Sequence, residues 1–222
     1  MDEQQLWNLL YDVEELLTRR EIPREPWKQE QPESREDQIN LIAREIDTCR
    51  RCGLSEHRVR SVPGQGVLDP QVLIIGEAPG AQEDQQGLPF VGAAGQYLDK
   101  WLAAIDLDRR QNVFIGNIIK CRPPENRDPL PDEQQACLPY LASQISVLKP
   151  KTILCLGRIA AQIMVGRSGG IGRLRGTVHD YHGIPLVATY HPSGVLRNPS
   201  YRRAVWEDLQ MIRKLLDEQN HG

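Results

Sequence analysis

Three polar side chains stand at or just beyond the ends of short apolar runs of the chain: Glu77, Asn117 and His191. A carboxylate can position water, a carboxamide can read hydrogen-bond donors and acceptors, and an imidazole N–H can stabilise developing negative charge. The glycines of residues 76–80 permit a tight turn and a close approach of the backbone to a ligand. A plain turn, a strand-end cap and a structural histidine would explain the same residues, so these positions alone leave both interpretations open.

A second loop, residues 82–95, is punctuated by glycines and begins with the acids Glu83 and Asp84. It presents one aromatic residue, Phe90. Since the chain contains only two phenylalanines, a ring placed in a Gly/Pro loop indicates a surface for stacking rather than a core position.

The cysteines form two groups, Cys49-x2-Cys52 and Cys121-x15-Cys137. By spacing alone, structural zinc and a [4Fe–4S] cluster are both compatible with four thiolates in this arrangement. Cys155 lies inside an apolar run and is interpreted as a small buried hydrophobe rather than a ligand. With five cysteines in all, a disulfide framework is not expected.

The elements that must position these residues alternate between strands and helices. Apolar β-rich runs cover residues 72–75, 113–115, 152–156 and 186–189, and helical stretches lie near 39–48, 93–105, 132–148, 157–165 and 200–217. Continuous apolar strands alternating with helices predict an α/β fold, three-layer α/β/α, with a central four-stranded, mostly parallel sheet. Ligands collect at the carboxyl ends of the strands in such folds, where the polar residues above stand.

Composition divides the chain into three parts. Residues 1–20 are predicted to form an amphipathic helix, residues 21–37 a Pro/Glu/Gln-rich linker, and residues 38–222 the folded domain. No apolar run is long enough to span a membrane and no basic segment precedes an apolar stretch at the N-terminus, so a cytoplasmic protein is expected. Residues 151–222 carry 10 basic against 5 acidic residues, which is compatible with a polyanionic partner or with an ordinary solvated surface.

Three blocks together resemble a known family: GEAPGAQEDQQGLPFVGAAGQ from residue 76, GNIIKCRPPENR from residue 116 and HPSGVLRNP from residue 191. In order and spacing they are similar to the signature blocks of the family 4 uracil-DNA glycosylases, the iron–sulfur members of that superfamily. The resemblance runs from about Cys49 to Leu215. It implies hydrolysis of the N-glycosidic bond of uracil in DNA, and a structural [4Fe–4S] cluster held by the four cysteines Cys49, Cys52, Cys121 and Cys137.

The resemblance also implies roles for the strand-end residues. Asn117 is expected to accept from uracil N3–H and to donate to O4, a pattern that cytosine reverses. Phe90 is expected to stack on the base, and His191 to stabilise the charge on the departing uracil at O2. Catalysis is therefore assigned to Glu77 and His191, and uracil binding to Gly76, Glu77, Ala78, Phe90, Asn117 and His191.

The segment from His191 to Arg197 is expected to contact DNA. Val195 and Leu196 are predicted to be exposed on this loop, as a wedge that fills the gap left by the flipped nucleotide, while Ser193 and Arg197 hold phosphates. The cluster is expected to anchor further arginines along a DNA-facing edge: Arg50, Arg51, Arg58, Arg60, Arg122 and Arg127.

The group that positions the water is less clearly indicated. Family 1 relatives carry an Asp and a Tyr where this chain has Ala78 and Gly80. Glu77 is the first candidate for the water, and Glu83 is the second, with guarding of the C5 edge of the base as its other role. Residues 123–128 lack the histidine with which some relatives capture the sugar covalently, so ordinary turnover is expected.

A competing hypothesis is a non-catalytic DNA-binding accessory module on the same fold, recruited to a polymerase through the N-terminal helix. A pure binder needs none of Glu77, Phe90, Asn117 and His191, so their joint presence argues against it. The expected partner is uracil-containing DNA, single- or double-stranded. The protein is expected to be a monomer, with a protein partner for the N-terminal helix as a further hypothesis.

Overall fold

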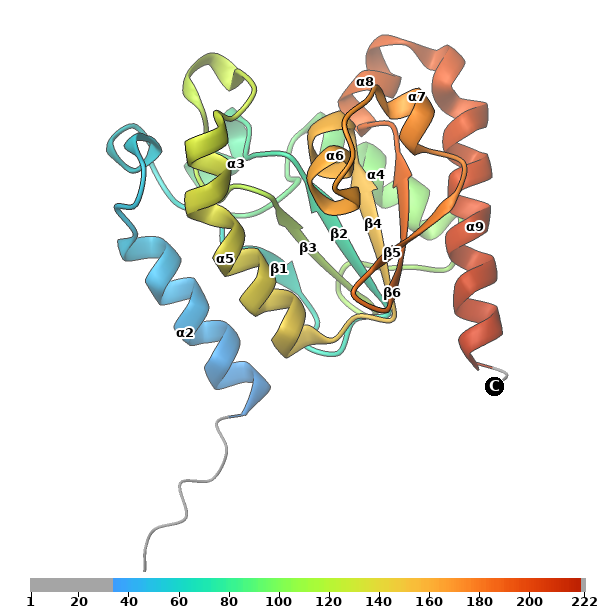
Figure 1. Cartoon of the computed structure of the whole chain (residues 1–222), viewed down its shortest axis with the longest axis horizontal. Helices are drawn as coiled ribbons and strands as arrows, with labels where there is room; N and C mark the ends of the chain where they lie inside the picture. The colour runs from blue at the N-terminus through green and yellow to red at the C-terminus, as the bar shows by residue number, and fades with distance from the viewer. Residues whose placement is uncertain (1–33, 221–222) are drawn as a thin grey trace, which may run out of the picture. The chain divides into compact units, whose positions relative to one another are not determined.

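The computed structural model describes residues 34–220, which form a mixed six-stranded sheet between two layers of helices (Figure 1). The predicted N-terminal helix and most of the predicted linker lie outside the described residues. The strands are β1 Gln65–Gly66, β2 Val72–Gly76, β3 Val113–Asn117, β4 Thr152–Leu156, β5 Val178–Tyr181 and β6 Ile184–Thr189. The helices are α2 Arg35–Thr48, α3 Ala81–Gln86, α4 Ala93–Ala103, α5 Pro131–Leu148, α6 Arg158–Val165, α7 Ile171–Leu174, α8 Pro192–Arg197 and α9 Arg202–Asn220.

The three-layer fold predicted from the sequence is confirmed, with a correction to the number of strands. The strand order is β1-β3-β2-β4-β6-β5. The four predicted strands are the inner ones, and they run parallel to one another. The two edge strands pair antiparallel and were not predicted. Strand β1 has only two residues and β5 is partly exposed and polar, so neither contains a continuous apolar run.

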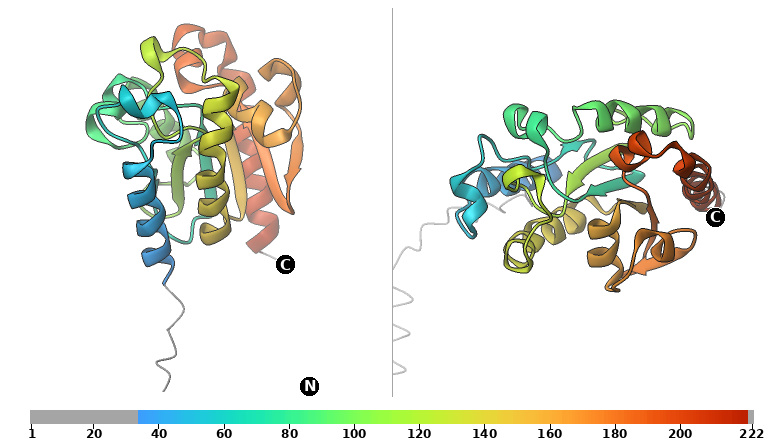
Figure 2. Two further views of the ribbon diagram at one scale, coloured as in Figure 1. Left: turned by 60° about the vertical axis from the view of Figure 1, so that its left-hand side comes forward. Right: turned by 90° about the horizontal axis from the view of Figure 1, so that it is seen from above.

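The inner strands are buried on both faces, and each face has its own core. In β2, Leu73 and Ile75 join the core beneath α2, α5, α6 and α7, whereas Val72 and Ile74 join the core beneath α4 and α9. The view from above separates these two layers of helices clearly (Figure 2). Among the described residues, no helix has the length and apolar character needed to cross a membrane.

Helix α2 begins earlier than the sequence pattern predicted. Its N-cap is Ser34, whose hydroxyl accepts from the Asp37 backbone N–H at 3.1 Å while the Asp37 carboxylate accepts from the Ser34 backbone N–H at 3.2 Å. This reciprocal capping stabilises a polar first turn that carries no apolar periodicity. Residues 35–37, assigned to the linker from the sequence, therefore belong to α2.

A buried ion pair ties α9 to the end of the sheet. Asp208 is fully buried and accepts from Arg175 Nε and Nη2, each at 2.8 Å, and from the Thr189 hydroxyl at 2.6 Å. Thr189 is the last residue of β6, two residues before His191. The Asp208 carboxylate thus fixes the strand end from which the histidine projects.

Asp208→Ala should destabilise the fold by about 3–5 kcal/mol, because it leaves the Arg175 guanidinium without its buried partner. Urea unfolding measures the loss. Glu207→Ala is the matched control, since this carboxylate contacts the same guanidinium at 3.4 Å but is half-exposed, and its loss should be below about 1 kcal/mol. Equal destabilisation by the two substitutions would contradict the role given to the buried pair.

Candidate active site

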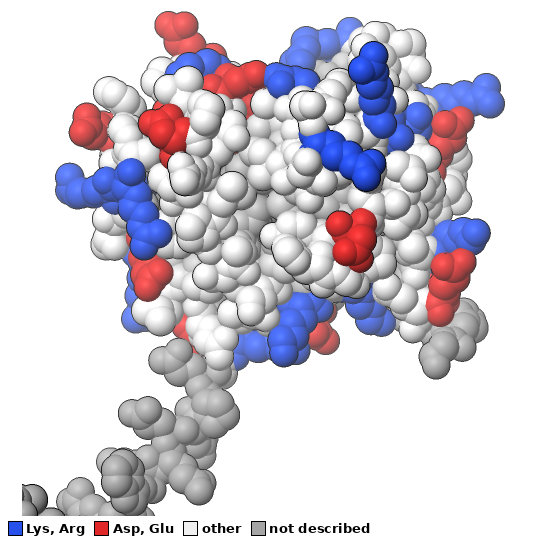
Figure 3. Space-filling view, viewed as in Figure 1, with Lys and Arg blue, Asp and Glu red and all other residues white. Residues whose placement is uncertain are grey.

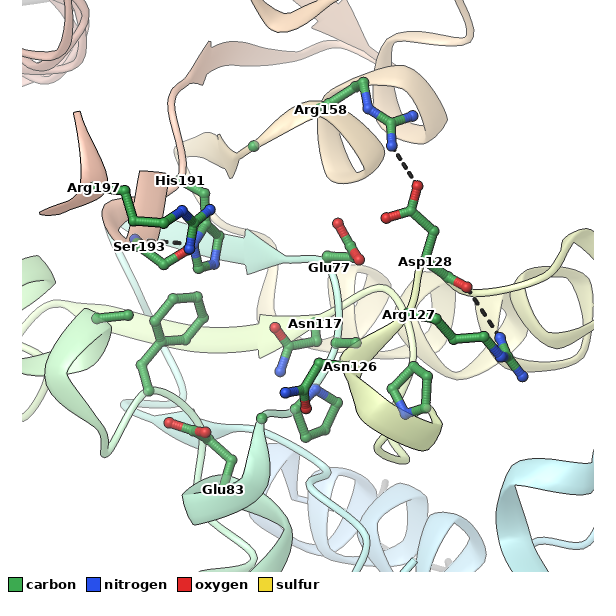
Figure 4. Close-up of a pocket in the computed structure, with 17 residues that line it drawn as sticks. Glu77, Glu83, Asn117, Asn126, Arg127, Asp128, Arg158, His191, Ser193 and Arg197 are labelled. Carbon is green, nitrogen blue, oxygen red and sulfur yellow. Dashed lines mark hydrogen bonds and ion pairs between the residues drawn. The ribbon is translucent and has the colours of Figure 1, made fainter. Parts of the chain in front are cut away.

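A cavity of about 480 Å³ opens at the carboxyl ends of the inner strands (Figure 4). Each of the four strands sends one residue to its wall: Glu77 after β2, Asn117 at the end of β3, Gly157 after β4 and His191 beyond β6. The parallel register forces this convergence, because the strands all end at one edge of the sheet. Its lining contains most of the predicted site residues, namely Glu77, Ala78, Glu83, Phe90, Asn117, His191, Ser193 and Arg197.

Asn117 is 1% exposed, and its side-chain oxygen has no hydrogen-bond partner. Leaving such a buried acceptor unpaired costs about 1–3 kcal/mol, so a donor from a bound ligand is the natural partner. Gly76 stands directly behind this group, and a Cβ there would lie 2.4 Å from Asn117 Oδ1 and 2.7 Å from Phe90 Cζ. Gly76 does not line the cavity, but its missing side chain makes room for the two groups that do.

Phe90 is buried at 6% exposure, and its ring centroid lies 5.6 Å from that of His191 with the planes tilted by 32°. Glu83, the second candidate for positioning the water, binds the backbone of the loop that carries Phe90. Its Oε1 accepts from the backbone N–H groups of Val91 at 2.9 Å and Gly92 at 3.0 Å. Glu83 therefore holds the loop that presents the ring, and that geometry favours a positioning role over activation of water.

The tautomer of His191 follows from its contacts. The Ser193 backbone N–H donates to Nδ1 at 3.2 Å, and the Ser193 hydroxyl lies 2.8 Å from the same nitrogen. Since Nδ1 accepts, the ring proton is on Nε2. Burial lowers the pKa of His191 to about 4, the positive charge of Arg197 adds to this effect, and Glu83 opposes it. The ring is therefore a neutral donor at physiological pH.

Glu77 carries the carboxylate whose surroundings suit a base. Burial raises its pKa, the negative charge of Asp128 raises it further, and Arg158 opposes both effects. A carboxyl whose pKa is raised binds a proton more readily, as a general base must. Figure 4 shows the Glu77 carboxylate directed into the space enclosed with Asp128 and His191.

One wall of the cavity was not predicted from the sequence. Asn126, Asp128 and Arg158 line it, and Asp128 forms an ion pair with Arg158 (Figure 4). Arg158 follows the end of β4 just as Glu77 follows β2, so the strand-end rule could have identified it. No sequence pattern pointed to Asp128, because its place in the cavity wall depends on how its loop folds. That loop is anchored by Arg127, which donates to both carboxylate oxygens of Glu133 at 2.9 and 2.6 Å.

The segment after His191 differs from its prediction in one respect. Residues Pro192–Arg197 form the short helix α8 rather than an open loop, and this helix turns Val195 inward until it is fully buried in the core with α4 and α9. The prediction that Val195 is an exposed wedge residue is therefore wrong. Leu196 remains 46% exposed on the outer side.

The four predicted cysteine ligands come together. Cys49, Cys52, Cys121 and Cys137 line one small pocket between α2 and α5, and none of them forms a disulfide. Burial raises the pKa of the Cys137 thiol to about 11, although the Lys120 ammonium and backbone N–H oppose this effect. Cys155 is fully buried within β4 and does not line this pocket, as expected.

The predicted arginines do not all face outward. Arg58 points into the cysteine pocket, where it donates to Cys121 Sγ at 3.0 Å and to the Cys49 carbonyl at 3.2 Å. Arg51 stacks on Tyr140 at 4.9 Å. Arg50, Arg51, Arg60 and Arg127 are exposed, and further exposed basic side chains gather over α6 to α9 on the face shown in Figure 3. That group comprises Arg158, Arg167, Arg173, Arg197, Arg202 and Arg203.

Comparisons with known proteins identify the family of this chain. Residues 63–210 match the Uracil DNA glycosylase superfamily. This chain belongs to the uracil-DNA glycosylase superfamily. A Type-4 uracil-DNA glycosylase of Pyrobaculum aerophilum is 46% identical over 177 residues, covering 75% of this chain and 89% of that protein. A Type-4 uracil-DNA glycosylase of Archaeoglobus fulgidus is 41% identical over 187 residues, covering 81% of this chain and 94% of that protein.

The family resemblance drawn from three sequence blocks is confirmed by these matches. In this uracil-DNA glycosylase superfamily member, the first two blocks provide Glu77, Phe90 and Asn117, and the third provides His191. The cavity brings all four together.

Imidazole ¹⁵N shifts should show His191 as the neutral Nε2–H tautomer throughout about pH 5.5–8, because its pKa is about 4 rather than the ~6.5 of a free histidine. Ser193→Ala is the control, since it keeps the backbone N–H that donates to Nδ1 and should keep the tautomer. A titration midpoint near that of free histidine, or an Nδ1–H tautomer, would contradict this assignment.

Proposed function

We propose that this chain hydrolyses the N-glycosidic bond of uracil in DNA, releasing free uracil and leaving an abasic site. The observation that carries the proposal is the unpaired acceptor of Asn117, buried in the same cavity as a neutral Nε2–H histidine and an aromatic ring. Uracil offers the matching set of groups, a flat ring with an N3–H donor between two carbonyl acceptors.

Asn117 accounts for the choice of base. Its free Oδ1 accepts from uracil N3–H, and its amide N–H₂ donates to O4. Cytosine has an acceptor at N3 and an amino group at C4, so it would leave the buried oxygen of Asn117 unpaired. A site built to pair a particular hydrogen-bonding pattern rejects an analogue that lacks it strongly, by about 10⁴–10⁵-fold in the best cases.

We assign stabilisation of the departing uracil to His191. When the bond from C1′ to N1 breaks, its electron pair departs with uracil and the charge is shared with O2. The neutral Nε2–H donates to that oxygen without transferring its proton, as an oxyanion-hole donor does. The low pKa of the ring keeps this donor in one protonation state over the physiological range.

We assign activation of the attacking water to Glu77. Once uracil has begun to leave, the sugar is oxocarbenium-like and water adds to C1′. The Glu77 carboxylate accepts a proton from that water, and burial makes it a better acceptor. We assign Glu83 to holding the loop, because Oε1 already accepts two backbone N–H groups.

DNA would lie across the mouth of the cavity. Arg197 is exposed at the rim and suited to a phosphate, and Leu196 is exposed beside it and suited to fill the space left by the flipped nucleotide. Ser193 is half-buried on His191, so we assign it to orienting the ring in addition to a phosphate contact. The basic group over α6 to α9 continues this surface.

We also propose that the cysteine pocket holds a [4Fe–4S] cluster with a structural role. Four thiols without disulfides around one pocket are a fitting donor set. Among the described residues, no three Cys, His, Asp or Glu side chains lie close enough to hold one metal ion. The resemblance to the Type-4 glycosylases is what favours a cluster over zinc. A cluster in this pocket would join α2 to the start of α5.

Release of free uracil from a uracil-containing oligonucleotide tests the function. We expect release by the wild-type chain, and Asn117→Asp should lower the uracil-to-cytosine rate ratio by at least about tenfold, because the carboxylate no longer offers an N–H to O4. Affinity for the oligonucleotide should change little.

Two outcomes would contradict this account. Tight binding of the oligonucleotide without release of uracil would support the accessory-module hypothesis. An equal loss of DNA affinity and of cleavage in Asn117→Asp would mark Asn117 as a structural residue.

For the cluster, we expect about four irons per chain and broad absorption in the visible region, and loss of both in Cys121→Ala. Cys155→Ala is the matched control, because this cysteine is buried outside the pocket and should keep the iron. A colourless protein with one equivalent of zinc would overturn the assignment.

A further inference from the structure

The ring of Phe90 is held by an unusual backbone. Its φ of 51° lies in the left-handed region, which side chains other than glycine adopt infrequently. Such a conformation persists only where the surrounding structure determines it. Gly95 is one such determinant, because a Cβ there would lie 1.7 Å from the Phe90 carbonyl oxygen.

Two charged side chains bind the backbone of this loop, one through its N–H groups and the other through its carbonyl groups. Glu83 accepts from the N–H groups of Val91 and Gly92, after the ring. Arg109 donates to the carbonyl groups at and before the ring, from Nη2 to Phe90 O at 3.0 Å and from Nη1 to Pro89 O at 3.3 Å. The donors and acceptors of the loop are therefore fixed by groups of matching polarity.

Arg109 is itself held in place. Its Nε donates to Asp99 Oδ1 on α4 at 2.8 Å, and its side chain is 21% exposed. A guanidinium can serve two carbonyls and a carboxylate at once, because its five N–H donors lie in one rigid plane. The neighbouring Arg110 is 85% exposed, and its Nε lies 3.6 Å from Asp108 Oδ1.

We propose that Arg109 is a positioning residue for catalysis, which acts by holding the Phe90 ring against the uracil site. The inference rests on the proposed function, in which the ring stacks on uracil. The position of the ring is closely constrained, because it lies between Gly76 and His191. An ideal Cβ at Gly76 would approach Phe90 Cζ to 2.7 Å. A shift of the loop would move the ring from the base and from the histidine together.

Single-turnover cleavage of a uracil oligonucleotide tests the proposal. Arg109→Ala should lower the rate by about 10- to 100-fold, the scale expected when a reacting group is misplaced by about 1 Å. It should also weaken inhibition by free uracil, and added guanidinium should restore part of the rate. Arg110→Ala is the matched control and should change the rate by less than about twofold, as expected of a surface substitution.

A double substitution separates positioning from general destabilisation. If Arg109 acts through the ring, then in a Phe90→Ala background Arg109→Ala should cause almost no further loss, because the two effects are coupled. Losses that multiply, or an Arg109→Ala rate equal to wild type, would overturn the proposal. Absence of uracil release by the wild-type chain would instead overturn the proposed function, so the two failures are distinguishable.

Discussion

The parallel alignment of β2, β3, β4 and β6 is the constraint on which the rest of the structure depends. Strands that are apolar on both faces have to be covered by helices on both sides, so the open edge at their carboxyl ends is where polar groups can meet. The cavity receives Glu77, Asn117, Arg158 and His191 from four strands that are spread over more than a hundred residues of chain. The helices that follow these strands return the chain and leave the cavity open.

Burial then sets the chemistry of the groups that meet there. The same loss of water lowers the pKa of His191 to about 4 and raises the pKa of Glu77. These opposite shifts have one cause, since desolvation disfavours the charged form of either group. The result is a neutral histidine that can donate a hydrogen bond and a carboxylate with increased affinity for a proton, which are the roles that the proposed hydrolysis assigns to them.

The charged residues around the cavity act largely on the backbone. Glu83 binds two amide groups, Arg109 binds two carbonyl groups, and Asp208 fixes the end of β6 through Thr189. Ser193 in turn orients the His191 ring. The reacting groups are thus positioned by a surrounding set of polar contacts, and preorganisation of this kind is what allows electrostatic stabilisation without rearrangement during the reaction.

The sequence by itself determined the family, the four inner strands, the three-layer fold and the convergence of Glu77, Phe90, Asn117 and His191. Those features follow from local patterns in the sequence: apolar runs, glycine turns and motif spacing. Only the tertiary structure decided that Val195 is buried, that Glu83 binds a loop backbone, that Arg58 faces the cysteines and that Asp128 meets Arg158. The two edge strands were missed because neither contains a continuous apolar run. The four contacts above depend on which other segment lies opposite a residue, and chain order does not specify that.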